Sequence, residues 1–204
     1  GVDFHKVGFC PYISSVFMIK DRTALAHNKN AYNCPFLYSM ENSRSADGPN
    51  SAYIALNVLG VEGFQILIGH LTEVAVHLRE EIESTNNFEV INKAGLGTAV
   101  MFIPILPKHI SFTNSKEETI VRNSYTMTFI EKLTNLGNPF YIDKIPSDST
   151  GGNSFPYTSL KAYIISPHSS KESNTEFVSF MIKIKKEIDQ NFNFNVQFYH
   201  TEDA

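Results

Sequence analysis

The sequence predicts an α+β fold in which helices cover one face of an antiparallel sheet. Two segments, 88–91 and 98–104, alternate apolar and polar residues and are separated by Gly95 and Gly97, which is typical of paired strands. Longer segments on both sides repeat apolar residues every three or four positions, as amphipathic helices do. Strands of this kind combined with two or three helices favour an α+β layer domain.

A helical stretch precedes the first strand and is interrupted once. Gly48-Pro49 places a proline where helices begin, Gly60 ends the first helix, and Glu62 starts the second. The apolar residues of the second helix recur at helical spacing: Phe64, Leu67, Ile68, Leu71, Val74, Ala75, Leu78 and Ile82. His70 and His77 are expected at the edge of the core rather than on a metal, since no third ligand stands near them in the sequence.

Two further helices are predicted from their capping signals. Residues 115–118 read Ser-Lys-Glu-Glu, which is a capping box, and Gly137 supplies the stop of that helix. Residues 173–176 cap the last helix in the same way. The segments 140–143 and 160–165 are predicted to be strands of the same domain.

Composition excludes several classes of function. A length of 204 residues fits one large or two small domains, and the net charge of −4 without a basic stripe argues against nucleic-acid binding. Uninterrupted apolar runs are too short to span a bilayer, and nothing at the N-terminus resembles a signal peptide. Cys10 and Cys34 have no metal-like spacing, so free thiols and a cytoplasmic location are expected.

The start of the chain combines a lysine with a tight turn and a strand. Asp3-Phe4-His5-Lys6 precedes Gly8 and Pro11-Tyr12, and residues 13–21 read as a buried strand that ends in charge. Lysine forms Schiff bases, and burial lowers its pKa enough to make it a nucleophile. The residue types alone also fit a surface lysine beside a structural histidine.

The pattern Asp-x-His-Lys-x-Gly-x-x-Pro-Tyr, followed by a strand, resembles the lysine segment of the group II pyridoxal-phosphate-dependent decarboxylases. That family includes aromatic amino acid, tyrosine, glutamate and diaminobutyrate decarboxylases. The Ser43-Arg44 turn, its following helix and the Leu-Gly-x-x-Gly-Phe hinge at 59–64 are similar to a second family block. Residues 160–167 resemble its late strand, although the family usually ends Asn-Pro where this chain has Ser-Pro, and Phe4 stands where many members have proline.

The resemblance implies an architecture and a reaction. The fold would be the C-terminal part of a fold type I pyridoxal-phosphate enzyme, with residues 1–84 as a large-domain remnant plus linking helices. Residues 85–204 would form the small α+β domain, with an antiparallel sheet and helices on one face. The reaction would be decarboxylation of an L-amino acid to an amine and carbon dioxide, carried out by a homodimer.

The resemblance also implies roles for particular residues. Lys6 would hold pyridoxal 5'-phosphate through a Schiff base, and His5 would lie beside the cofactor phosphate. Ser43 matches a serine that reaches the phosphate bound to the other subunit, or it serves only as a turn residue before the helix. Arg44 either pairs a carboxylate or braces the turn.

A tyrosine in the polar loop 24–43 is the expected proton donor. In aromatic members of the family, a mobile loop after the lysine strand carries a tyrosine that protonates the substrate Cα. Tyr32 occupies the corresponding loop, and Tyr38 is the second choice. Either tyrosine could instead be an ordinary exposed side chain.

Much of such a site would have to come from elsewhere. In this fold type, the aspartate that pairs the pyridine nitrogen, the aromatic stacking residue and most phosphate ligands precede the lysine. Only five residues precede Lys6, so the chain is expected to be inactive alone and to need a missing N-terminal half of the same protein. Two alternatives stay open: a carbon–carbon lyase resembling sphingosine-phosphate lyase, and a non-catalytic dimerisation or binding module.

Overall fold

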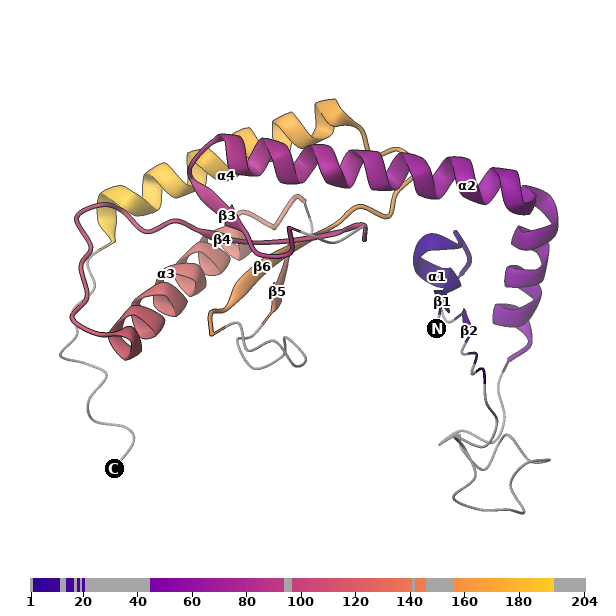
Figure 1. The fold of residues 1–204 in the computed structure, drawn as a ribbon, viewed down its shortest axis with the longest axis horizontal. Helices are drawn as coiled ribbons and strands as arrows, with labels where there is room; N and C mark the ends of the chain where they lie inside the picture. The colour runs from indigo at the N-terminus through magenta and orange to yellow at the C-terminus, as the bar shows by residue number, and fades with distance from the viewer. Residues whose placement is uncertain are drawn as a thin grey trace, which may run out of the picture. The chain divides into compact units, whose positions relative to one another are not determined.

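The computed structural model of the chain describes residues 2–11, 14–16, 18, 20, 45–93, 97–140, 142–145 and 156–192. These residues belong to two compact units, Gly1–Gly69 and His70–Ala204. Figure 1 labels the helices and strands of both units.

The N-terminal unit begins with a small antiparallel ribbon. Strands β1 (Val2–Asp3) and β2 (Ser15–Val16) pair with Val2 opposite Val16, and the single helical turn α1 (Phe4–Val7) lies between them in the sequence. The prediction of a buried strand over 13–21 is wrong for the described residues. Both residues of β2 are exposed, because a two-stranded ribbon has no layer that covers its faces.

Helix α2 (Asp47–Ser84) contains the predicted interruption. Gly60 has a φ of 61° and a ψ of −172°, a left-handed conformation that glycine adopts without steric cost, and helical geometry resumes after it. The prediction that one helix stops at Gly60 and another follows is therefore confirmed. The chain bends at this point instead of continuing as one straight helix (Figure 1).

The C-terminal unit contains a four-stranded antiparallel sheet in the order β3-β4-β6-β5. Its strands have the following bounds: β3 Phe88–Val90, β4 Ala99–Pro104, β5 Asp143–Ile145 and β6 Ser159–Tyr163. Val90 lies opposite Phe102, and Phe102 lies opposite Leu160, so these three side chains share one face of the sheet. All three are buried, and this face forms the core of the unit.

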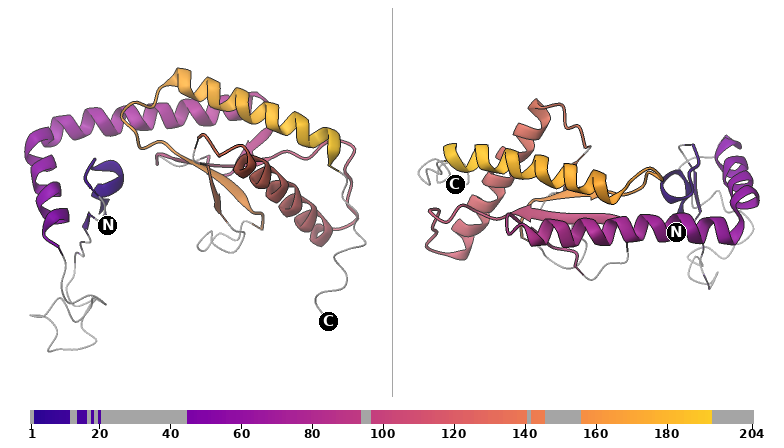
Figure 2. Two further views of the ribbon diagram at one scale, coloured as in Figure 1. Left: turned by 180° about the vertical axis from the view of Figure 1, so that it is seen from behind. Right: turned by 90° about the horizontal axis from the view of Figure 1, so that it is seen from above.

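Three helical segments pack on that face: the 70–84 part of α2, α3 (Ser115–Asn135) and α4 (Lys171–Asn191). Figure 2 shows α4 running alongside this part of α2, and the Asn174 side chain of α4 donates to the Val74 carbonyl of α2. The Phe102 ring meets Phe88 and Phe177 edge to face, with ring centroids 5.7 and 6.2 Å apart. The predicted α+β class with helices on one face is confirmed.

The second half of α2 buries the later part of the apolar face that the periodicity predicted: Leu71, Val74, Ala75, Leu78 and Ile82. The earlier part of that predicted face is not buried: Phe64 and Leu67 are half-buried, and Ile68 is exposed. The two histidines lie at the edge of this core. His70 Nε2 is 2.9 Å from the Ser169 carbonyl oxygen, and His77 Nδ1 is 3.2 Å from Asn174 Nδ2. Their prediction as core-edge residues is confirmed.

Several element boundaries differ from prediction. The N-cap of helix α3 is Asn114, one residue before the predicted Ser115. The Asn114 side chain accepts a hydrogen bond from the Glu117 amide, and the Glu117 carboxylate accepts one from the amide of residue 113. Helix α4 uses Ser170 and Ser173 as its capping box, three residues before the predicted one. Strands β5 and β6 are 143–145 and 159–163 rather than 140–143 and 160–165.

Helix α2 is long and apolar enough to cross a membrane by length and composition alone. An 18-residue window of it has a mean hydropathy of 1.5, and 6% of that window is buried. A single helix of this kind is weak evidence for a membrane span. The prediction from uninterrupted apolar runs does not detect this window, because the mean hydropathy of a helix can be high even where a few polar residues interrupt it.

Candidate functional site

Lys6 lies in α1, which follows β1 and precedes β2 in the sequence. Its Nζ donates to Asp3 Oδ2 over 2.5 Å, and the two side chains are 44% and 40% exposed. The hydrogen bond from Lys6 is the main reason why the pKa of the Asp3 carboxyl lies below its ordinary value. The lysine is therefore presented at the surface of this unit as one half of an ion pair.

His5 anchors the turn that carries Lys6. Its backbone N–H donates to the Ser14 carbonyl oxygen at 3.0 Å, and its Nδ1 lies 2.8 Å from the same atom. The buried Ser14 hydroxyl donates to the Gly48 carbonyl oxygen at 3.0 Å, at the start of α2. Hydrogen bonds therefore connect α1, which carries Lys6, to the start of α2 through Ser14, and they hold the backbone of α1 in place.

Gly8 ends α1 in a space that admits no side chain. A β-carbon at this position would lie 2.5 Å from Phe4 Cδ1 and 2.8 Å from Phe4 Cα. The second contact is with backbone, which cannot move aside as a flexible side chain can. The amides of Gly8 and Cys10 both donate to the Phe4 carbonyl oxygen, so a displaced Phe4 would disrupt the whole turn.

Gly8→Ala is expected to destabilise this turn by about 1–3 kcal/mol, the usual cost of overpacking. The check is amide hydrogen exchange in the full chain, where the Cys10 amide should exchange about tenfold faster or more. Gly69→Ala is the matched control, because a β-carbon there meets nothing within 4 Å. Equal exchange at Cys10 in both variants would contradict the described packing.

Lys6 is not buried in this unit. A lysine becomes nucleophilic when burial favours its neutral form, whereas Lys6 is exposed and paired with a carboxylate. An enclosing surface would have to come from beyond the described residues. Tyr32 and Ser43, together with Tyr38 and Arg44, lie outside the described residues, so their predicted roles stay predictions.

An apolar groove lies in the same unit as Lys6. It has a volume of about 670 Å³ and is formed by α1 and by α2 on both sides of its bend. Its apolar lining residues are Phe4, Val7, Leu56, Val61, Phe64 and Ile68. The helical periodicity predicted Phe64 and Ile68 on the apolar face of a helix, but it did not indicate that they line a groove.

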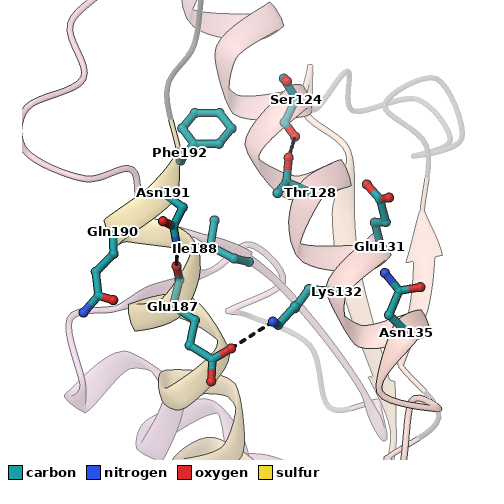
Figure 3. Close-up of a pocket in the computed structure, with 10 residues that line it drawn as sticks. All are labelled: Ser124, Thr128, Glu131, Lys132, Asn135, Glu187, Ile188, Gln190, Asn191 and Phe192. Atoms are coloured by element: carbon teal, nitrogen blue, oxygen red, sulfur yellow. Dashed lines mark hydrogen bonds and ion pairs between the residues drawn. The ribbon is translucent and has the colours of Figure 1, made fainter.

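A second, polar pocket of about 550 Å³ lies between α3 and α4 (Figure 3). Lys132 Nζ and Glu187 Oε2 face each other there at 2.9 Å, and Lys132 lowers the pKa of Glu187. The Asn191 side chain donates to the Glu187 carbonyl oxygen. This ion pair joins the exposed edges of the two helices, and the pocket contains neither Lys6 nor His5.

The buried contact between α3 and α4 contains a further polar cluster. The Tyr125 hydroxyl donates to Asp189 Oδ1, and Lys185 Nζ donates to Asp189 Oδ2 at 2.8 Å. Burial, followed by the contact with Asp189, raises the pKa of Tyr125 far above its ordinary value. The phenol therefore stays protonated, and the cluster fixes the two helices against each other rather than providing a base.

Sequence reasoning also missed Arg79, which is buried in the C-terminal unit. Its Nη2 donates to the carbonyl oxygens of Gly97 and Ala99 at 2.7 and 3.0 Å, at the turn before β4. Its Nε and Nη1 are buried without a hydrogen-bond partner among the described groups, and desolvation lowers its pKa. The sequence did contain a signal for this burial: Arg79 lies four residues after Ala75, so it falls on the apolar face of α2.

The sequence matches no protein-family model, and no curated protein sequence matches it. Solved structures do resemble it. Lactobacillus brevis glutamate decarboxylase aligns with a TM-score of 0.57 and 13% identity, over 76% of this chain and 31% of that one. The glutamate decarboxylase domain of the Vibrio parahaemolyticus diaminobutyrate-pyruvate transaminase and L-2,4-diaminobutyrate decarboxylase gives 0.55 and 12%, over 76% and 29%.

Oryza sativa TDC, crystallised with PLP and tryptamine, gives a TM-score of 0.53 and 13% identity, over 68% of this chain and 26% of that one. Identities this low establish a common fold and no more. The chain spans between about a quarter and a third of the length of these structures. Its fold is that of part of a pyridoxal-phosphate-dependent amino acid decarboxylase.

Proposed function

We propose that this chain is the C-terminal part of a pyridoxal-phosphate-dependent amino acid decarboxylase and that Lys6 is the residue that holds the cofactor. The observation that carries the proposal is the coincidence of two independent findings. The residues around Lys6 resemble the lysine segment of that family, and the fold of the chain matches solved decarboxylases. The intact enzyme would act as a cytoplasmic homodimer.

The residues around Lys6 fit the attachment of an aldehyde cofactor. The amine is accessible, and the bonds from His5 to Ser14 and from Ser14 to Gly48 hold its turn in place. A phosphate needs several donors or cations, and the four-residue α1 is too short to provide them as a helix N-terminus. We infer that the phosphate and the pyridine nitrogen are held by groups outside the described residues, Ser43 of the partner subunit among them.

When bound, the cofactor supplies an electron-withdrawing ring that makes loss of a carboxylate as carbon dioxide feasible. In this proposal, the chain holds the Lys6 amine in position for the cofactor. The Lys6 amine is paired with Asp3 in the chain by itself, so it must leave Asp3 and give up a proton before it can attack a carbonyl. Covering this surface with the rest of the enzyme would favour the neutral amine.

Reductive labelling tests the proposal. Borohydride reduction of the intact protein with pyridoxal 5'-phosphate is expected to attach one pyridoxyl group to Lys6, located by peptide mass spectrometry. Lys20 is the internal control, because it is also exposed but lies beyond the turn. Labelling at Lys20 or Lys29 in place of Lys6 would overturn the assignment.

The product separates the decarboxylase from its alternatives. Release of carbon dioxide and an amine supports the proposal, whereas a long-chain aldehyde would indicate the carbon–carbon lyase. If Lys6→Ala changes neither the cofactor absorbance nor any turnover of the intact protein, the chain is a non-catalytic module. The isolated 204-residue chain is expected to bind the cofactor no better than other proteins with exposed lysines.

A further inference from the structure

We infer that Ser14 is a positioning residue for Lys6, because its buried hydroxyl ties the segment that carries the lysine to the start of α2. The inference rests on the proposed function, in which Lys6 holds the cofactor. Ser14 is 4% exposed, and its Oγ donates to the Gly48 carbonyl oxygen at 3.0 Å. Gly48 is buried too, and the two residues are 34 positions apart in the sequence.

The segment that carries Lys6 needs a tether of this kind. Helix α1 has four residues, and strands β1 and β2 have two residues each. A single helical turn and a two-stranded ribbon are both marginally stable in water when nothing else supports them. Bonds to other parts of the unit therefore decide where α1 lies.

Side-chain packing between α1 and α2 is incomplete. The open groove of about 670 Å³ has Phe4 and Val7 of α1 on one side and Leu56 and Phe64 of α2 on the other. Apolar side chains that line an open groove do not interlock as they do in a close-packed core. A buried, directional hydrogen bond therefore contributes more to the placement of α1 than it would in a fully packed interface.

The backbone of Ser14 holds the residue next to Lys6. Its carbonyl oxygen accepts from the His5 amide at 3.0 Å and lies 2.8 Å from His5 Nδ1. The Ser14 amide nitrogen lies 3.3 Å from the same ring nitrogen. Ser14 thus connects Gly48, through its side chain, to both the main chain and the ring of His5, so a displaced Ser14 would carry the Lys6 amine with it.

The first test uses the full 204-residue chain without cofactor. In Ser14→Ala, the His5 amide is expected to exchange its hydrogen about fivefold faster, because the loss of one buried hydrogen bond makes local opening more frequent. Ser51→Ala is the matched control, since the Ser51 hydroxyl also donates to a backbone carbonyl, that of Asp47, but the bond stays within α2. The exchange at His5 should be unchanged in this control, and circular dichroism should show equal helix content in all three proteins.

The second test measures how fast the intact protein attaches the cofactor. Pyridoxal 5'-phosphate is added at a series of pH values, the product is trapped with borohydride, and the pyridoxyl group is located by peptide mass spectrometry. In Ser14→Ala, the highest rate at Lys6 is expected to fall about fivefold, while the pH at half of that rate stays the same. The rate at the exposed Lys20 should not change, and a role of Ser14 in stability alone would alter neither rate in the folded protein.

Equal rates at Lys6 in the wild type and Ser14→Ala would overturn the inference, and so would an equal loss in Ser51→Ala. A shifted pH dependence in Ser14→Ala would also overturn it, because the residue would then act on the ionisation of the amine and not on its position. A wild type labelled at another lysine refutes the proposed function instead. In that case, the exchange at His5 still decides whether Ser14 holds α1 in place.

Discussion

Replacing Tyr32 with phenylalanine is expected to slow turnover of the intact enzyme roughly a hundredfold, which is the low end of the range for one acid–base group. Cofactor binding is expected to stay unchanged. The reaction replaces the carboxylate of the substrate Cα with a proton, and the proton must arrive on one face of that carbon. A loop can bring an acid to this position and exclude water while it is closed. The phenol of Tyr32 would supply this proton.

The composition of the loop is the reason for choosing Tyr32. Residues 24–43 are polar and contain Pro35, and Tyr32 is flanked by Ala31 and Asn33, which are small or polar. The region lies outside the described residues, so the assignment rests on the sequence and on the resemblance. Turnover and cofactor absorbance, measured on the same preparation, check the prediction.

Tyr38→Phe is the control within the same loop. If it slows turnover and Tyr32→Phe does not, the loop register differs from the one inferred here. If neither variant slows turnover, the proton comes from a residue outside the loop, and the segment is only a connection. Oxidative or transamination by-products in the slow variant would add support, because a delayed proton leaves time for side reactions.

The fold was predictable where local chemistry decides the structure. The break at Gly60 needed only a residue that tolerates positive φ between two apolar helical patterns, and the strand pair 88–90 and 99–104 needed only alternation around glycines. Helix starts were harder to place. Asn114 and Ser170 compete with nearby Ser residues for the same capping role, and the choice depends on the path of the incoming chain.

The site was less predictable because it depends on what covers it. The sequence indicated that Lys6 follows a tight turn, and the Gly8 contact with Phe4 explains why that turn is tight. It could not indicate that Asp3 pairs with Lys6, since aspartate and lysine three residues apart meet only if the chain makes a helical turn there. Burial of β2 and of Lys6 depends on a neighbouring layer, and no local pattern encodes one.

Phe102→Ala is expected to lower the free energy of unfolding of the C-terminal unit by about 3–5 kcal/mol, the usual cost of removing a buried aromatic ring. Phe102 is fully buried at the centre of the sheet, between β3 and β6. Its ring contacts Phe88 edge to face from the neighbouring strand and Phe177 from α4. The alanine variant would lose the apolar transfer energy and both ring contacts, and it would leave a cavity between sheet and helices.

Phe112→Ala is the matched control, because Phe112 is the same residue type and 37% exposed. Its effect should stay within about 0.5 kcal/mol. Urea unfolding of the full chain, followed by the circular dichroism of the helices, should show a midpoint lowered by about 2 M for Phe102→Ala, given a slope of about 2 kcal/mol/M. If the two variants unfold at the same urea concentration, Phe102 does not hold the helices on the sheet, and the described core is wrong at its centre.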